Sequence, residues 1–132
     1  MNPESTSAWL ALLELQSGVV SRGQVLGHGL DDDMIENRLR SRRWRPVHWG
    51  VYATFSGRLS REAVLWAAVL RAGPGAALSH QTAAELLGLT GDRSDVIHLT
   101  VPLGRHPAPI RGAVIHRSGR IGAATHPVQR AS

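Results

Sequence analysis

Residues 21–53 have the clearest pattern of local structure in the chain and read SRGQVLGHGLDDDMIENRLRSRRWRPVHWGVYA. Ser21 is followed three residues later by Gln24, which is the spacing of a helix capping box. The triplet Gly27-His28-Gly29 is typical of a helix end. These residues predict a short helix over about residues 21–26.

A further helix is predicted over about residues 31–41, with Asp31 opening it and two more aspartates in a first turn that favours negative charge. At 100° per residue, Ile35 and Leu39 share the face that we expect to point inward. The residues expected to point outward are Asp33, Asn37, Arg40 and Ser41.

The flanking segments complete an N-terminal domain predicted over residues 7–57. Ser7 is the expected cap of a helix over residues 8–16, and residues 44–52 form a β-rich run interrupted by Pro46 and Gly50, typical of a hairpin or an edge strand. Helices followed by a β-segment indicate a winged helix-turn-helix. Within the β-rich run, we interpret Trp44 and Trp49 as residues that close a small core, in preference to indoles that stack on bases or ribose.

The remaining chain predicts a small α/β half-domain over residues 58–120, with two to three strands. Ser60 is expected to cap one helix, and Ser79 or His80 to begin another that ends near Leu87. Strands are predicted over residues 96–101 and 113–117, and residues 121–132 are expected to be a disordered tail. The predicted fold class is therefore α+β.

Composition excludes several classes of enzyme. The chain has 132 residues, and its 15 basic residues are all arginine; lysine and cysteine are both absent. A P-loop needs its lysine, restriction-type nucleases commonly use one, and Schiff-base chemistry requires one. Without cysteine the chain has no disulfide, no thiolate nucleophile and no cysteine-ligated zinc or iron–sulfur site.

Charge and hydropathy point to a polyanionic partner. The formal net charge is +5 with histidine neutral. No apolar run approaches the roughly 18–20 residues that cross a membrane, and the N-terminus lacks the basic segment of a signal peptide. We therefore expect a cytoplasmic location without membrane association.

The strongest local signal for function is the stretch from Asn37 to Arg61, which contains seven arginines and no acidic residue. Arginine offers phosphates both charge and bidentate hydrogen bonds. We predict that three outward side chains read base edges: Asn37, Arg40 and Ser41. We predict that five others contact phosphates: Arg38, Arg42, Arg43, Arg45 and His48. The alternative is a solvated basic face, and the acidic residues 31–33 argue against simple nonspecific binding.

His98 and His116 occupy similar positions on the two predicted strands, so pairing of the strands would bring them together. Two imidazoles can bind a metal or exchange protons, but only Asp95 offers a nearby third ligand. We therefore favour structural or surface histidines, and we expect no metal and no cofactor. Ser79 and His80 are adjacent, so their side chains diverge and predict no nucleophile–base pair.

The ordered motifs resemble a known family. Residues 18–22, 29–30, 38–41 and 44–53 look like the N-terminal winged helix of AbiEi-type antitoxins of type IV toxin–antitoxin systems. Residues 66–68, 77–84, 97–101 and 114–118 are similar to the actinobacterial branch of that family. The resemblance covers about residues 18–121.

The resemblance implies a non-enzymatic transcriptional autorepressor that binds double-stranded DNA and whose partner, when present, is a nucleotidyltransferase-type toxin. Many actinobacterial relatives add a domain resembling a very-short-patch-repair endonuclease, and we expect this chain to be without one. A truncated remnant of such a protein therefore stays open beside a short DNA-binding module. Two further hypotheses are a protein-interaction module whose arginine face meets an acidic toxin surface without DNA, and a phosphoesterase that uses His98 and His116.

Overall fold

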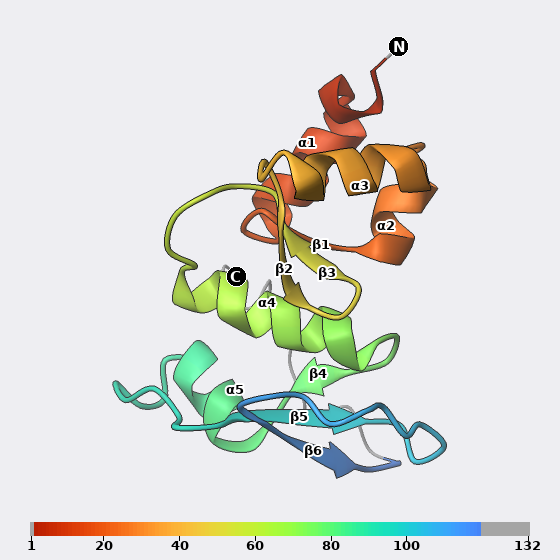
Figure 1. Cartoon of the computed structure of the whole chain (residues 1–132). Helices are drawn as coiled ribbons and strands as arrows, with labels where there is room; N and C mark the ends of the chain where they lie inside the picture. Colours follow the sequence, from red (N-terminus) through yellow and green to blue (C-terminus); the bar gives the residue numbers. More distant parts are fainter. Residues whose placement is uncertain (1, 120–132) are drawn as a thin grey trace. The chain divides into compact units, whose positions relative to one another are not determined.

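The computed structural model describes residues 2–119, and these form helices together with two small sheets, which confirms the α+β class. The tail expected at residues 121–132 lies outside the described residues. The chain divides into two compact units, residues 1–67 and 68–132 (Figure 1). The division falls inside helix α4 (Arg61–Ala72), so each unit is described by itself.

The first unit contains a short 3-10 helix, three α-helices, three strands and the first part of α4. In chain order its elements are η1 (Pro3–Ser5), α1 (Ser7–Leu15), β1 (Val19–Ser21), α2 (Arg22–Gly27), α3 (Asp32–Arg40), β2 (Arg45–His48) and β3 (Val51–Ala53). The three helices lie together and the β2–β3 hairpin runs beside them (Figure 1).

Helices α1 and α2 each begin directly after a residue whose side chain caps the helix. Ser21 Oγ accepts a hydrogen bond from the Gln24 N–H at 3.2 Å, and Gln24 Oε1 accepts one from the Ser21 N–H at 3.0 Å. The predicted capping box is therefore confirmed. The predicted cap of α1 was wrong by one residue, because Thr6 Oγ1, not Ser7, accepts the hydrogen bond from the Trp9 N–H.

The sheet of the first unit has the order β1–β3–β2, and both pairings are antiparallel. Tyr52 lies opposite Val20 on one side and Pro46 on the other, and the register shifts between Pro46 and His48. Gly50 turns the hairpin with a φ of +72°, a left-handed conformation that glycine adopts without a steric penalty. Strand β1 was not expected, because three residues are too few to display a period.

A row of aromatic rings joins the helices to the hairpin. Trp44 stacks on Trp9 with ring centroids 5.9 Å apart and on Tyr52 at 6.1 Å. Ile35 is buried from α3 and Leu39 packs against the same core, which confirms the predicted inward face. The core interpretation is confirmed for Trp44, which is 4 % exposed.

The core interpretation is wrong for Trp49, whose side chain is 85 % exposed. Trp49 follows the last residue of β2 and precedes Gly50, so it lies in the turn of the hairpin. A side chain in this two-residue turn is carried beyond the last paired residues of both strands. The alternation of residues along the sequence did not reveal where the strand ends.

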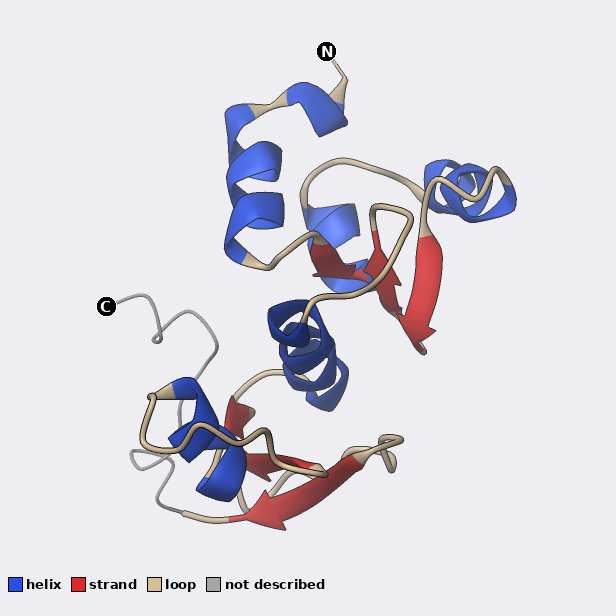
Figure 2. Cartoon of the chain, turned by 90° about the vertical axis from the view of Figure 1, so that its left-hand side faces the viewer, coloured by secondary structure: helices blue, strands red, loops and turns tan. Residues whose placement is uncertain are grey.

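The second unit contains the end of α4, three strands and one further helix. Figure 2 draws its helices in blue and its strands in red. Its elements after α4 are β4 (Ala77–Leu78), α5 (His80–Leu86), β5 (Ile97–Val101) and β6 (Ala113–Arg117). The sheet order is β4–β5–β6, in which β4 pairs antiparallel with β5 and β6 pairs parallel with β5. Three strands agree with the number predicted for this half-domain.

Strand β5 lies at the centre of the second unit. Ile97, Leu99 and Val101 are buried on it, as expected for apolar residues that alternate along a strand. The backbone N–H of His98 donates to Thr82 Oγ1 at 2.8 Å, so α5 is fastened to β5 by a buried hydroxyl. His98 thereby has a fixed position on the strand.

Candidate nucleic-acid interface

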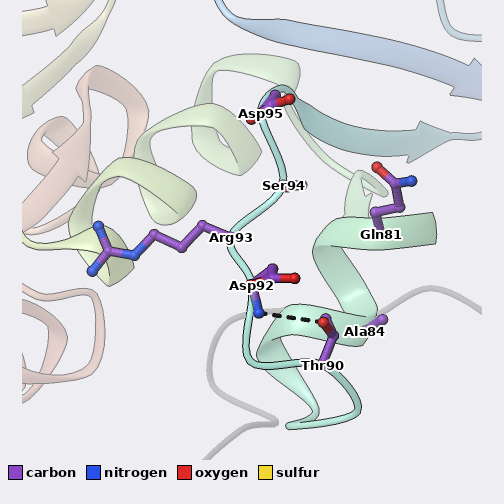
Figure 3. Close-up of a pocket in the computed structure, with 7 residues that line it drawn as sticks. All are labelled: Gln81, Ala84, Thr90, Asp92, Arg93, Ser94 and Asp95. Atoms are coloured by element: carbon purple, nitrogen blue, oxygen red, sulfur yellow. Dashed lines mark hydrogen bonds between the residues drawn. The ribbon is translucent and has the colours of Figure 1, made fainter.

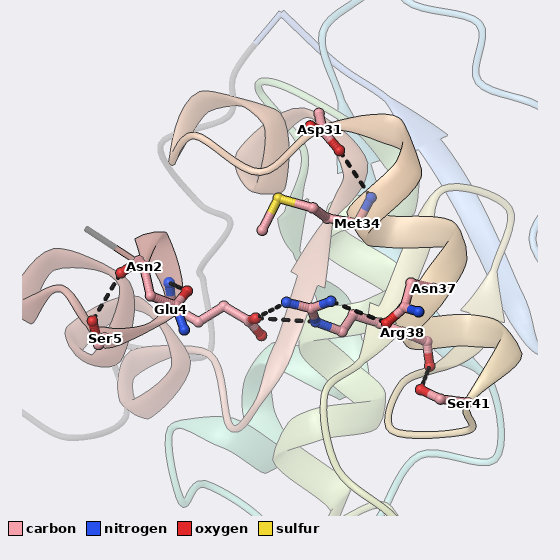
Figure 4. Close-up of polar contacts among 8 residues, drawn as sticks. All are labelled: Asn2, Glu4, Ser5, Asp31, Met34, Asn37, Arg38 and Ser41. Atoms are coloured by element: carbon pink, nitrogen blue, oxygen red, sulfur yellow. Dashed lines mark hydrogen bonds and ion pairs between the residues drawn. The ribbon is translucent and has the colours of Figure 1, made fainter.

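The two ends of helix α3 carry opposite charges, negative at its start and positive at its end. Asp31 caps it by accepting a hydrogen bond from the backbone N–H of Met34 at 2.9 Å, and Asp32 forms an ion pair with Arg22 (Figure 4 shows the cap). Glu36 lies 3.6 Å from Arg40 in an exposed pair, a type that contributes little to stability. Acidic groups thus occupy the start of the helix and arginines its end, as the helix dipole favours.

Most of the predicted DNA-contacting side chains are exposed. The three predicted base readers, Asn37, Arg40 and Ser41, all lie on the surface of the first unit. Arg42 and Arg43 follow directly and are exposed as well. We call Arg40, Arg42 and Arg43 the basic end of α3, since they project from its last turn and the residues just after it.

Arg38 has a partner within the unit. Its Nε donates to Glu4 Oε1 at 3.0 Å, its Nη2 makes a second contact with the same oxygen, and its Nη1 donates to Asn37 Oδ1 at 3.2 Å (Figure 4). The Arg38 side chain is only 12 % exposed and that of Glu4 22 %. Arg38 therefore fastens η1 to α3, and contact with a phosphate would require it to exchange partners.

Arg42 has a backbone conformation that favours glycine. Its φ is +63°, and its N–H donates to the carbonyl of Leu39 at 3.1 Å, which closes the end of α3. The following turn is held by the Trp44 N–H, which donates to the Arg38 carbonyl at 3.0 Å. Arg42 therefore ends α3 in a left-handed conformation that costs a residue with a side chain roughly 1–2 kcal/mol.

We expect Arg42→Gly to raise the free energy of unfolding by about 0.5–1 kcal/mol, because glycine adopts a left-handed conformation without strain but costs more chain entropy. Arg42→Ala keeps the strain and should change stability by less than about 0.5 kcal/mol. Urea unfolding followed by tryptophan fluorescence measures both variants. Equal stability of the glycine and alanine variants would show that residue 42 is not strained.

The last two predicted phosphate contacts lie on the hairpin. The Arg45 guanidinium donates to the carbonyl of Gly57 and lies over the Phe55 ring with Cζ 5.6 Å from the ring centroid. This cation–π contact ties β2 to the segment after β3. His48, the other residue, is half-buried at the end of β2.

A cavity of about 660 Å³ lies between the end of α3 and the hairpin, within the first unit. Leu39 lines it from α3, and the hairpin contributes five consecutive residues and Tyr52: Pro46, Val47, His48, Trp49, Gly50 and Tyr52. Arg22 lies at the same cavity, where the Tyr52 side chain and then the charge of Asp32 raise the pKa of its guanidinium. Leu39 of α3 and the hairpin turn therefore line the same cavity.

His98 and His116 are brought together in the second unit, as pairing of their strands predicted. His98 Nδ1 lies 3.1 Å from His116 Nε2, within hydrogen-bond distance. Burial, and then the neighbouring His80 and His98, lower the pKa of His116. His80 was not predicted to join this pair, because its place beside Ser79 in the sequence does not reveal which strand it approaches. Its ring centroid lies 4.0 Å from that of His116.

Asp95, the carboxylate considered as a third ligand, lines a separate polar cavity of about 670 Å³ (Figure 3). Gln81 and Ala84 of α5 form one wall, and Thr90 with residues 92–95 forms the rest. The Asp92 N–H donates to Thr90 Oγ1 at 3.2 Å, so this loop is held by a local turn. In residues 2–119, no group of three or more histidine or acidic side chains is placed to hold a metal ion.

Comparison with protein-family models and with curated proteins finds no match to this sequence. The family resemblance therefore stays a prediction. Among the helices of residues 2–119, none has the length and apolar character needed to cross a bilayer.

Sequence reasoning also missed the exposure of Trp49 and the contact between Glu4 and Arg38. A tryptophan directly before Gly50 is a signal that could have placed the indole in a turn, because glycine is favoured where the backbone turns back. No comparable signal exists for Glu4, which lies 34 residues before Arg38 in the sequence.

Proposed function

We propose that the chain is a non-enzymatic, DNA-binding transcriptional regulator whose first unit acts as a winged helix-turn-helix. In this proposal α2 and α3 form the helix-turn-helix and the β2–β3 hairpin forms the wing. The observation that carries it is the basic end of α3, where three arginines are exposed, together with the exposed Trp49 of the hairpin turn, which lines one cavity with Leu39 of α3. Between residues 37 and 61 no acidic residue offsets these charges.

The charge division of α3 determines how we place the DNA. Recognition helices commonly contact bases with their N-terminal residues, but here the N-terminal half carries four carboxylates that phosphates repel. We therefore place the duplex against the basic end of α3 and the hairpin. Asn37, Arg40 and Ser41 would read base edges, and Arg42 and Arg43 would contact phosphates.

The hairpin supplies the second contact in this proposal. Trp49 is carried beyond the paired strands and borders the same cavity as Leu39 of α3. An exposed indole next to a basic surface suits the sugar edge or an exposed base of a duplex. His48, at the adjoining end of β2, would contact a neighbouring phosphate.

Autorepression and a nucleotidyltransferase-type toxin as partner are proposed on the family resemblance alone. A second candidate function is binding of a protein without DNA, and the acidic half of α3 supports it. Asp33 and Glu36 are exposed there and present negative charge on the surface. A partner with a basic surface would meet this half of the helix.

Titration of the protein into a labelled duplex from its own upstream region, beside a scrambled duplex, tests the proposed function. We expect tighter binding to the upstream duplex and an affinity that falls steeply with salt. Equal affinities for the two duplexes would show that a basic surface binds DNA without reading its sequence. Absence of binding to both duplexes at low salt would overturn DNA binding in favour of the protein partner.

A further inference from the structure

Three histidines from distant parts of the sequence converge in the second unit, outside the proposed DNA-binding surface. His80 begins α5, His98 lies on β5 and His116 lies on β6. Their ring centroids are 4.0 Å apart for His80 and His116, 5.4 Å for His98 and His116, and 5.7 Å for His80 and His98. The proposed DNA-binding function uses none of them.

His98 and His116 share a hydrogen bond in the absence of metal, and a bound ion would take the place of the proton between their nitrogens. The 3.1 Å between His98 Nδ1 and His116 Nε2 is close to the separation of two nitrogens bound to one tetrahedral ion. Two metal–nitrogen bonds of about 2.0–2.1 Å at a tetrahedral angle place the nitrogens about 3.4 Å apart. Both residues are partly buried on paired strands, so the pair is held without metal.

His80 can become the third ligand by rotation of its side chain. The three rings do not yet form a complete metal site within residues 2–119. Unlike the other two, however, His80 is exposed, so its ring can turn without repacking the core. Its φ of +54° is a left-handed conformation that a residue with a side chain adopts only at a cost, and such strain is concentrated at functional sites.

We propose that His80, His98 and His116 together bind one divalent transition-metal ion, with His98 Nδ1 and His116 Nε2 as the preformed pair. Imidazole nitrogens select ions of the zinc, cobalt, nickel and copper group over magnesium and calcium, which prefer oxygen. Three protein ligands leave a fourth position for water or an external ligand. The proposed metal site shares no residue with the proposed DNA-binding surface, so either proposal can fail while the other holds.

Calorimetric titration of the full chain with Zn²⁺ tests the proposal. In a second experiment, the visible absorption spectrum of added Co²⁺ reports the coordination number of the bound ion. We expect one ion per chain and a four-coordinate Co²⁺ spectrum. His98→Ala and His116→Ala should each weaken Zn²⁺ binding by about 100-fold or more, and His80→Ala by about 10-fold or more. His106→Ala removes a histidine of the same unit outside the cluster, and it should bind Zn²⁺ like the unchanged chain.

We expect His80→Ala to stay folded, because the side chain is exposed and its removal leaves the core intact. A loss of Zn²⁺ binding in this variant therefore reports on the site and not on unfolding. Circular dichroism of each variant without metal establishes that it is folded. The proposal is overturned if the unchanged chain does not bind Zn²⁺, or if folded His80→Ala binds it as tightly as the unchanged chain. An equal loss of binding in His106→Ala would overturn it as well.

Discussion

Replacing Arg42 and Arg43 together by alanine is expected to weaken binding of duplex DNA by about 10- to 100-fold near physiological salt, for upstream and scrambled duplexes alike. Both side chains are exposed at the basic end of α3, where the proposal places phosphates. Each lost phosphate contact lowers the slope of log affinity against log salt by about 0.9, so the slope should fall by about 1.8. Fluorescence anisotropy at several salt concentrations measures affinity and slope together.

The matched control for this experiment is Arg93→Ala with Arg111→Ala. These two arginines are exposed in the second unit, so their removal changes the net charge equally but leaves the basic end of α3 intact. Affinity and slope should stay close to those of the unchanged chain. If both double variants lose affinity equally, net charge and not the basic end of α3 drives binding.

Trp44→Ala is expected to cost about 3–5 kcal/mol of unfolding free energy in the first unit. The Trp44 ring is 4 % exposed and stacks on both Trp9 and Tyr52, so its removal opens a cavity in the middle of the aromatic row. This loss is a large fraction of the 5–15 kcal/mol typical of a whole domain. Urea unfolding followed by fluorescence should show a large shift of the midpoint.

Trp49→Ala is the control for this substitution, because it removes the same side chain from a position that is 85 % exposed. The change in unfolding free energy should stay within about 0.5 kcal/mol. Similar losses for the two variants would contradict the division of the tryptophans into a buried and an exposed group.

The parts of the fold that were predicted correctly depend on short-range chemistry. Ser21 and Gln24 bond to each other's backbone within one turn, so their spacing alone revealed the start of α2. The face of α3 followed from Ile35 and Leu39 because the helical period is constant. Such features need only a few neighbouring residues to be visible.

The parts that were missed depend on contacts between distant segments. The parallel direction in which β5 and β6 pair, and the approach of His80 to His116, arise when the chain closes on itself, and no local spacing encodes either. The same holds for Arg38, which was predicted to contact phosphate and which the fold places against Glu4. Composition revealed the basic stretch but not which arginines have partners within the protein.

The most direct test of the proposed DNA-binding surface is acrylamide quenching of tryptophan fluorescence with and without duplex DNA. Trp9, Trp44 and Trp66 are 2–7 % exposed, so quenching reports almost entirely on Trp49. We predict that saturating DNA protects Trp49 from the quencher, and that Trp49→Phe removes most of the quenching seen without DNA. DNA binding detected by anisotropy while Trp49 stays fully accessible would contradict the placement of DNA against the hairpin and the basic end of α3.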